Sequence, residues 1–400
     1  MKSKIMAISL FGITAGIVGF YPLYQQSNAL PQHVDAVATK HTAQSAKKIE
    51  LVFALDTTGS MSGLIAAAKE KIWSIATNMA QAQSHPEIKM GLVAYRDRGD
   101  TYVTRVIDLS SDLDSMYSQL MDFKAGGGGD TAESVNQALY DAVHKMNWSQ
   151  DQQTYKAIFL VGDAPPHMDY QNEVQYPKSM VMAARKGILV NTIQCGSDNQ
   201  TKLQWQQIAS LGQGDYFSVH QNGSAVAVAT PYDKELAKLS EELDATRLYY
   251  GSKEELAKKK AKIDATTKLN EKASVESRAR RATFNSSDSG KLNFLGKGDL
   301  VEDVQSGRVK LDEIDKAKLP AAIVAMPAEE QQKLIEQTEQ KRTDIKRQIQ
   351  ALADQRGAFI KKELEKTGGA KDSLDEQLIG TLRKQAKKKG LRYEGESIVY

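Results

Sequence analysis

Short apolar runs alternate with amphipathic helical patterns from about residue 49 to residue 220. The runs LVFAL and AIFLV are apolar at every position, as expected of strands that are covered on both faces of a parallel sheet. Between the runs, apolar residues recur at intervals of three and four, which indicates helices. This alternation predicts an α/β fold, namely a doubly wound, mostly parallel sheet with helices on both faces.

The predicted elements follow one another in a regular order along this region. We predict strands at residues 49–55, 88–95, 103–108, 157–161, 189–194 and 216–219. We predict helices between them at residues 63–83, 113–121, 131–146, 176–186 and 203–210.

Beyond about residue 221 the strand patterns stop, and Lys, Glu, Ala and Gln dominate a series of helical patterns. One predicted helix covers residues 232–249, and another covers residues 329–366. The second carries a narrow stripe at steps of four, three and seven, made of Ile345, Ile349, Leu352 and Phe359. Such a stripe suits pairing with another helix. It indicates either a charged helical hairpin packed on itself or on the first domain, or a coiled coil that binds other proteins or oligomerises.

Two further features of this region carry predictions. A stretch rich in Ser, Asn and Gly at residues 285–298 is predicted to be a loop that marks an internal boundary. The basic residues Arg278, Arg280 and Arg281, and the run Lys387-Lys388-Lys389, lie among acidic residues. We therefore predict solvated helix faces there rather than phosphate-binding patches.

The first residues have the pattern of an export signal. Lys2 and Lys4 precede an apolar segment at residues 5–20, and Ser27-Asn28-Ala29 offers the small residues of a cleavage site. We predict a signal peptide or membrane anchor at 1–29, a linker at 30–48, an α/β domain at 49–222 and a helical region at 223–400. The expected location is periplasmic or secreted, with anchoring in the inner membrane if the segment is retained.

Charge and cysteine content exclude several classes of function. The 53 basic and 50 acidic residues give a net charge of +3, without the clear basic excess of a nucleic-acid-binding domain. Cys195 is the only cysteine of the sequence, so it can form no internal disulfide and no iron–sulfur or thiolate zinc site. Its apolar surroundings predict a buried structural thiol.

Candidate chemistry lies just after the strands, because open α/β sheets bind ligands beyond the carboxyl ends of their strands. Three loops there carry short oxygen side chains: Asp56-x-Thr58-x-Ser60, then GGGGDT at residues 126–131, then GDA at residues 162–164. The first loop imitates a hydrolase elbow, but Met61 stands where the serine nucleophile belongs. Neither glycine-rich loop has the lysine of a phosphate loop. Oxygen ligation of a hard cation such as Mg²⁺ remains.

At these residues the sequence resembles the von Willebrand factor A domain with its metal-ion-dependent adhesion site. The resemblance covers about residues 49–219 and is nearest to the alpha-kinase-linked and hemicentin-type A domains, to which DTTGSM, YRD, GGGGDTAE and GDAPPH are similar. It implies five metal-site residues: Asp56, Thr58, Ser60, Thr131 and Asp163. Many family members have Gly-Gly-x-Thr on the second loop, whereas here Asp130 precedes Thr131 and Glu133 follows. Asp130 therefore stays an alternative ligand to Thr131, which we favour.

The resemblance implies a Mg²⁺ or Mn²⁺ site that accepts a carboxylate from a partner protein. We expect a binding module rather than an enzyme, without nucleic-acid partners. The alternative is a periplasmic scaffolding protein whose C-terminal helices bind partners and whose metal site is only structural. The tripeptide Arg98-Gly99-Asp100 is expected to belong to the A-domain pattern rather than to an integrin-binding site, and His167 is expected to be a loop residue without a metal role.

Overall fold

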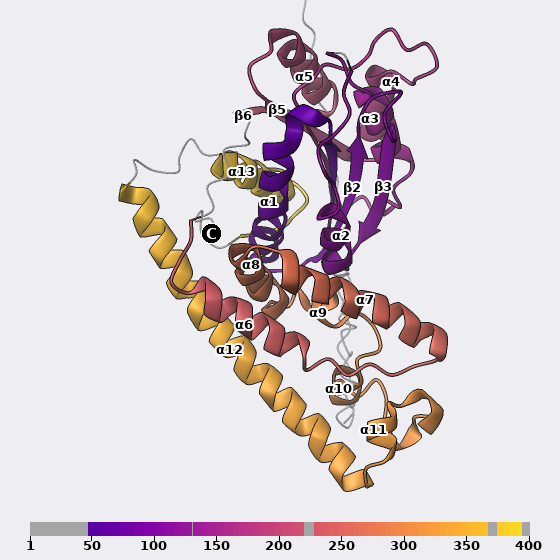
Figure 1. Cartoon of the computed structure of the whole chain (residues 1–400), viewed down its shortest axis with the longest axis vertical. Coiled ribbons are helices and arrows are strands. Elements are labelled where there is room, and N and C mark those ends of the chain that lie inside the picture. The colour runs from indigo at the N-terminus through magenta and orange to yellow at the C-terminus, as the bar shows by residue number, and fades with distance from the viewer. Residues whose placement is uncertain (1–46, 130, 220–227, 367–373, 394–400) are drawn as a thin grey trace, which may run out of the picture. The chain divides into compact units, whose positions relative to one another are not determined.

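The apolar runs of the sequence form one six-stranded sheet (Figure 1). The computed structural model describes residues 47–129, 131–219, 228–366 and 374–393, so the predicted signal segment and almost all of the predicted linker lie outside the described residues. The strands are β1 (Lys48–Asp56), β2 (Glu87–Tyr95), β3 (Thr104–Ser110), β4 (Tyr155–Gly162), β5 (Ile188–Cys195) and β6 (Gln213–Val219). Their order is β3-β2-β1-β4-β5-β6, with β3 antiparallel to β2 and the other neighbouring pairs parallel.

Helices cover both faces of the sheet, which confirms the predicted fold class. Side chains alternate between the faces of a strand, so Phe53 and Leu55 of β1 lie in one apolar cluster while Val52 and Ala54 lie in the other. The first cluster includes α1 (Ser62–Ala80) and α2 (Leu113–Leu120). The second cluster includes α3 (Val135–His144), α4 (Tyr176–Arg185) and α5 (Asn199–Leu211).

A helix from the far end of the sequence completes the first face. Leu378 and Leu382 of α13 (Leu374–Lys387) are buried in the same cluster as Phe217 of β6, and Figure 1 shows α13 beside α1. Polar contacts fix the helix to the sheet, since the Tyr155 hydroxyl donates to Gln385 Oε1 over 2.7 Å. The residues between β6 and α13 are therefore an insertion into the α/β domain, rather than an extension after it.

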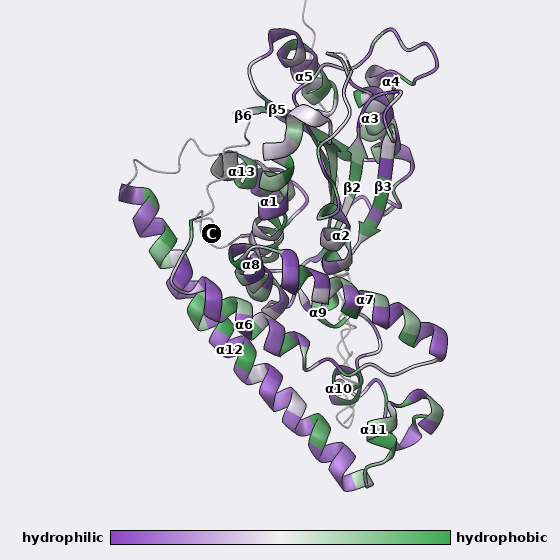
Figure 2. Ribbon diagram, in the orientation of Figure 1, coloured by the Kyte–Doolittle hydropathy of each residue, from purple (hydrophilic) through white to green (hydrophobic). Residues whose placement is uncertain are grey.

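The insertion consists of helices. They are α6 (Asp233–Asp244), α7 (Lys253–Lys272), α8 (Val275–Ser286), α9 (Lys291–Leu295), α10 (Leu300–Gln305), α11 (Ala321–Val324) and α12 (Ala328–Lys366). Short 3-10 helices η2 (Leu311–Glu313) and η3 (Lys316–Lys318) precede α11. Hydrophilic and hydrophobic residues are interspersed along α12 (Figure 2). Ile345 and Ile349 of its predicted stripe pack on Leu236 and Leu239 of α6, so the stripe pairs with a helix of the same chain. No described helix has the length and apolar character that crossing a membrane requires.

The predicted loop at residues 285–298 is correct only in part, because residues 287–290 and 296–298 lie outside helices but the others do not. Residues 291–295 form α9, and Asn285 and Phe294 are buried. Phe294 fills the cluster between α6 and α12, while Asn293 donates to Asn285 over 2.7 Å. Tertiary packing thus overrides the turn-forming composition of this stretch.

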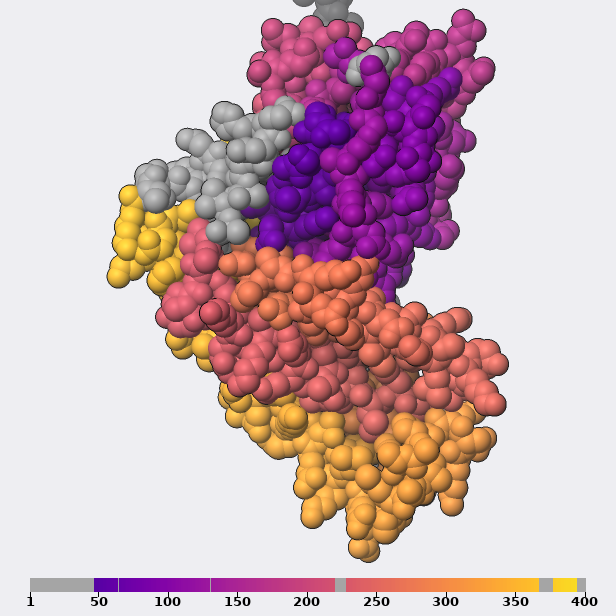
Figure 3. Space-filling view, in the orientation of Figure 1, coloured from indigo at the N-terminus to yellow at the C-terminus, as the bar shows by residue number. Residues whose placement is uncertain are grey.

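The predicted solvated face at Arg278, Arg280 and Arg281 is wrong. Arg281 is fully buried and Arg280 is 8% exposed, and Arg278 pairs with Glu241 at 2.7 Å. The α8 helix that carries them lies against α1 and α6, and Figure 3 shows the atoms of the insertion in direct contact with those of the α/β domain. Lys387 and Lys388 are exposed, as predicted, whereas Lys389 is half-buried and donates to Gln152 O over 2.9 Å.

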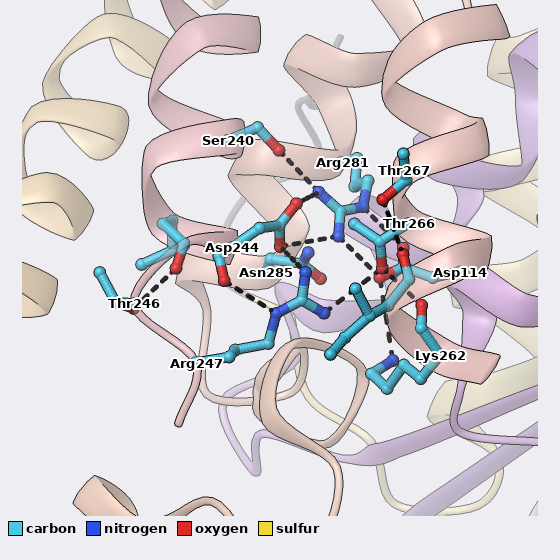
Figure 4. Close-up of polar contacts among 12 residues, drawn as sticks. Asp114, Ser240, Asp244, Thr246, Arg247, Lys262, Thr266, Thr267, Arg281 and Asn285 are labelled. Atoms are coloured by element: carbon cyan, nitrogen blue, oxygen red, sulfur yellow. Dashed lines mark hydrogen bonds and ion pairs between the residues drawn. The ribbon is translucent and has the colours of Figure 1, made fainter. Parts of the chain in front are cut away.

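Arg281 is the centre of a buried ion cluster that joins the insertion to α2 (Figure 4). Its guanidinium donates twice to Asp114 of α2, at 2.6 Å each, and twice to Asp244 of α6, at 2.8 and 3.0 Å. Arg247 reaches Asp244 at 2.9 Å, and Lys262 lies 3.8 Å from Asp114. Burial alone would raise the pKa of the Asp114 carboxyl, but Arg281 and Lys262 outweigh burial and hold that pKa well below its ordinary value.

Candidate metal centre

The first candidate loop orients one carboxylate at the end of β1. Asp56 is fully buried, and its Oδ1 accepts hydrogen bonds from the amide and the hydroxyl of Thr58, at 2.8 and 2.7 Å. Its Oδ2 is buried with no hydrogen-bond partner among the residues that the structure describes. Ser60, in the 3-10 helix η1 (Gly59–Met61), is exposed. The loop thus holds Asp56 rigidly and leaves one of its oxygens without a hydrogen bond.

The third loop brings Asp163 next to Asp56. The two residues follow neighbouring parallel strands whose register pairs Leu55 with Val161. Gly162 allows this close packing, because a Cβ there would collide with the Tyr95 hydroxyl and lie 3.0 Å from the Cβ of Asp56. Asp163 also raises the pKa of Asp56 through its negative charge. Two of the predicted ligands are therefore neighbours at the point where the strand order reverses.

The glycine-rich second loop lies against the first loop. Gly126 N donates to Thr57 O over 3.1 Å, and Gly59 N donates to Gly127 O over 3.2 Å. Gly127 has φ +82°, and a Cβ on it would run into the Asp100 carboxylate, which accepts from Gly128 N at 3.1 Å. The loop therefore requires glycine at position 127.

The structure describes only one of the two predicted second-loop ligands. Asp130 lies outside the described residues. Thr131 is described and exposed at the surface of the loop. The choice between these two side chains stays a prediction.

Glu133 lies in the site although the sequence interpretation did not include it among the ligands. It is 4% exposed, and its Oε1 and the Cβ of Thr58 each lie 3.6 Å from the position that a Cβ on Gly128 would take. Its backbone ties the second loop to the third, donating to Pro165 O at 3.0 Å and accepting from His167 N at 3.1 Å. The sequence could have pointed to Glu133 through its spacing, since Glu133 stands two residues after Thr131.

The carboxyls of this centre have strongly shifted pKa values. Burial, with a smaller contribution from the Asp163 charge, raises the pKa of Asp56 to about 7, although the hydrogen bonds from Thr58 and, more weakly, the backbone N–H of Asp163 oppose the shift. Burial and the charges of Asp56, Asp97, Asp100 and Asp163 raise the pKa of Glu133 to about 9. These shifts mean that both carboxyls hold their protons more strongly than ordinary carboxyls do, and a bound cation would favour their charged forms.

The available donors suit a hard cation. They are carboxylate and hydroxyl oxygens, which Mg²⁺ and Mn²⁺ prefer. Within the described ranges, no group of three or more His, Cys, Asp and Glu is arranged to hold a metal ion. A cation at Asp56 and Asp163 would therefore need the hydroxyls of Thr58 and Ser60, together with water, to complete its coordination.

The rim of the centre is built from side chains that contact one another. Asp97 accepts from the hydroxyls of Ser134 and Tyr170 at 2.9 and 2.8 Å. His167 stacks on Tyr170 with ring centroids 3.9 Å apart, and its Nε2 lies 3.4 Å from Asp97.

The Arg98-Gly99-Asp100 tripeptide is used within the chain. Arg98 covers the Tyr170 ring at 4.0 Å and pairs with Glu173 at 3.1 Å. Because Asp100 accepts from the second loop, both charged side chains of the tripeptide hold the rim together. This arrangement favours the expectation that the tripeptide belongs to the fold.

Cys195 is buried, as predicted, and burial raises the pKa of its thiol. It lies in the apolar cluster beneath α1 and α13. A thiol in that environment is unreactive.

Comparisons with known proteins found similarity in the α/β region. Residues 50–230 match the family model of the von Willebrand factor A domain. Among solved structures, the chain is similar to proximal thread matrix protein 1 from the mussel byssus (14% identity, TM-score 0.35, 44% of this chain and 43% of that chain). Another structure of that protein is described as having a zinc occupied MIDAS motif (14% identity, TM-score 0.36, 45% of this chain and 43% of that chain). The SpRpn10 VWA domain is also similar (14% identity, TM-score 0.35, 45% of this chain and 91% of that chain). The match thus spans less than half of the mussel protein, and no curated protein matched the chain.

Proposed function

We propose that the von Willebrand factor A domain at residues 50–230 holds a divalent cation, Mg²⁺ or Mn²⁺, and uses it to bind an acidic side chain of a partner protein. The observation that carries the proposal is the buried Oδ2 of Asp56, which has no hydrogen-bond partner in the described part of the chain and lies beside the Asp163 loop. An unpartnered buried carboxylate oxygen destabilises a fold unless a cation or a proton compensates it.

The residues of the centre have separate roles in this proposal. Oδ1 of Asp56 accepts a hydrogen bond from the Thr58 hydroxyl. The lone pairs of that hydroxyl therefore point away from the carboxylate. Asp163 adds a second carboxylate, and Ser60 and Thr131 add hydroxyls from exposed loop positions. The bound cation would supply a Lewis-acid position for a carboxylate oxygen from outside the chain.

In the same proposal the chain is an exported binding module without catalytic activity of its own. The signal pattern of residues 1–29 supports export to the periplasm or beyond. The alternative is a scaffolding protein whose helical insertion binds the partner and whose metal only stabilises the fold. The extent of α12, at 39 residues, with a largely exposed polar surface, is the observation that favours it.

Cation binding is tested first, by calorimetric titration of Mn²⁺ and Mg²⁺ into the purified chain and into Asp56→Ala. We expect saturable binding to the wild type and none to the variant. Asp169→Asn is the matched control, because Asp169 belongs to the third-loop region but is exposed and should leave affinity unchanged. A wild-type chain that binds neither ion refutes the proposal.

Partner binding is tested by capture from a cell-envelope extract, with Mg²⁺ or with EDTA. In the proposed function, EDTA and Asp56→Ala both abolish capture, while circular dichroism shows an intact fold. Capture that survives both treatments supports the scaffold instead. A truncation before α13 cannot separate the two functions, because α13 supplies part of the A-domain core.

A further inference from the structure

We propose that Arg96 and Arg105 bind a second carboxylate of the partner segment whose first carboxylate ligates the cation. This inference rests on the proposed function, because it names the kind of partner that the metal centre would hold. That partner is an acidic segment with two carboxylates close together. The two arginines contact it outside the coordination of the metal.

Both arginines lie at the edge of the sheet where the metal centre is formed. Arg96 directly follows β2, whose last residue, Tyr95, pairs with Asp56 in the parallel register. The neighbouring strand β3 runs in the opposite direction, so Arg105 lies near its start, paired with Ala94. Both guanidinium groups therefore belong to the edge that a partner segment at the cation would cover.

The two guanidinium groups share one aromatic ring. The Cζ atoms of Arg96 and Arg105 lie 4.6 and 4.7 Å from the centroid of the Tyr102 ring. The Tyr102 hydroxyl lies 2.7 Å from the hydroxyl of Thr57, which itself donates to Tyr95 O over 2.9 Å. Thr57 belongs to the first loop of the metal centre. The ring that holds both cations is therefore hydrogen-bonded directly to that centre.

Neither arginine has a carboxylate partner among the residues that the structure describes. Arg96 donates to Lys124 O over 2.8 Å, and its Nε is buried without a hydrogen-bond partner in the same ranges. Arg105 and Lys124 are exposed, and within the described part of the chain no ion pair joins either to an acidic side chain. Two like charges on one ring repel each other, and a bound carboxylate would offset this repulsion.

The rim of the centre contains the same arrangement in a completed form. Arg98 lies over the Tyr170 ring at 4.0 Å and pairs with the Glu173 carboxylate at 3.1 Å. There the chain itself supplies the carboxylate for a guanidinium that lies on a tyrosine ring. A guanidinium presents a fork of N–H groups that matches a carboxylate. The ligand that suits Arg96 and Arg105 is therefore a carboxylate from outside the described chain.

The test uses synthetic peptides with blocked ends, fluorescently labelled, in anisotropy titrations with Mn²⁺ present. One peptide carries a single Asp, and the others carry two Asp residues separated by one, two or three glycines. We expect one of these spacings to bind about tenfold tighter than the single-Asp peptide, the scale of one hydrogen-bonded charge pair. Arg105→Gln should remove that advantage, and circular dichroism should show an intact fold because Arg105 is exposed.

Arg185→Gln is the matched control. Arg185 is an exposed arginine that ends α4 just before β5 begins, at the opposite edge of the sheet. Its replacement changes the net charge equally and should keep the advantage of the two-Asp peptide.

Three other outcomes would count against this reading. Equal affinity of the wild type for all the peptides overturns the inference and leaves the proposed function intact. An advantage that persists in Arg105→Gln, or that Arg185→Gln loses as well, also overturns it, because total charge then accounts for the effect. If Mn²⁺ does not strengthen binding of the single-Asp peptide relative to EDTA, the proposed function is refuted together with the inference.

Discussion

Replacement of Arg281 by methionine should destabilise the whole fold. The guanidinium is fully buried and makes four hydrogen bonds to Asp114 and Asp244 and a fifth to Ser240 at 2.8 Å. Methionine fills much of the same volume but leaves two carboxylates without their principal partner. Removal of one member of a buried pair typically destabilises by about 3–5 kcal/mol.

The contacts that remain after the Arg281→Met substitution determine where in that range the loss of stability should fall. Arg247 still reaches Asp244 at 2.9 Å, whereas Lys262 is 3.8 Å from Asp114 and also pairs with Asp112 at 2.6 Å. Asp244 therefore keeps a cationic partner, whereas Asp114 keeps only the side-chain amide of Asn293, at 3.3 Å, and the more distant Lys262. We expect a loss of about 3 kcal/mol, near the lower end.

Urea unfolding at pH 7, followed by circular dichroism, measures this loss. A double-mutant cycle with Asp114→Asn isolates the pair, and the double variant should be less destabilised than the sum of the single variants by about 1–3 kcal/mol. Arg278→Met is the control, because Arg278 has one exposed partner, Glu241, and should lose less than about 1 kcal/mol. A loss below about 1 kcal/mol for Arg281→Met, or strictly additive effects, would refute the reasoning.

Three further predictions concern other parts of the molecule. The pKa of Asp114 is held below its ordinary value, so its contribution to stability is present above about pH 4 and is lost as the pH falls further. When the free energy of unfolding is measured at decreasing pH, Asp114→Asn should lose less stability than the wild type. An equal loss of stability in acid for both proteins would contradict this. Leu382→Ala in α13 should destabilise the α/β domain by about 2–5 kcal/mol in urea unfolding, since Leu382 is fully buried in its core; an unchanged midpoint would show that α13 is not required. Gly127→Ala should weaken Mn²⁺ binding in calorimetry, because a Cβ there collides with Asp100; unchanged affinity would separate this loop from the centre.

The strands of the α/β domain were predictable because strands that are buried on both faces of a sheet are apolar at nearly every position. Runs such as residues 51–55 and 157–161 are apolar throughout, and the strands observed around them extend the predicted bounds by only a few residues. The loops after β1 and β4 were predictable for a related reason, since parallel strands deliver their carboxyl ends to one edge. The sequence therefore placed Asp56 and Asp163 together correctly.

Other features depend on contacts between distant residues, which local patterns do not record. Arg281 looks like a solvated residue until α2 and α6 supply Asp114 and Asp244 around it. Glu133 looks like an ordinary polar residue before a helix until the second loop folds over Thr58. The return of α13 to the sheet was missed because its amphipathic pattern shows that a helix has an apolar face but not which surface covers that face.

The return of α13 also fixes the order in which this protein can acquire its structure during synthesis. β6 ends at Val219 and α13 begins at Leu374, so a ribosome completes every strand of the sheet long before it makes the helix that covers part of it. During that interval the apolar cluster around Phe217 lacks Leu378 and Leu382, which α13 contributes to it. Contacts between segments so far apart in sequence also slow folding. The nascent chain should therefore depend on chaperones until its C-terminal segment emerges.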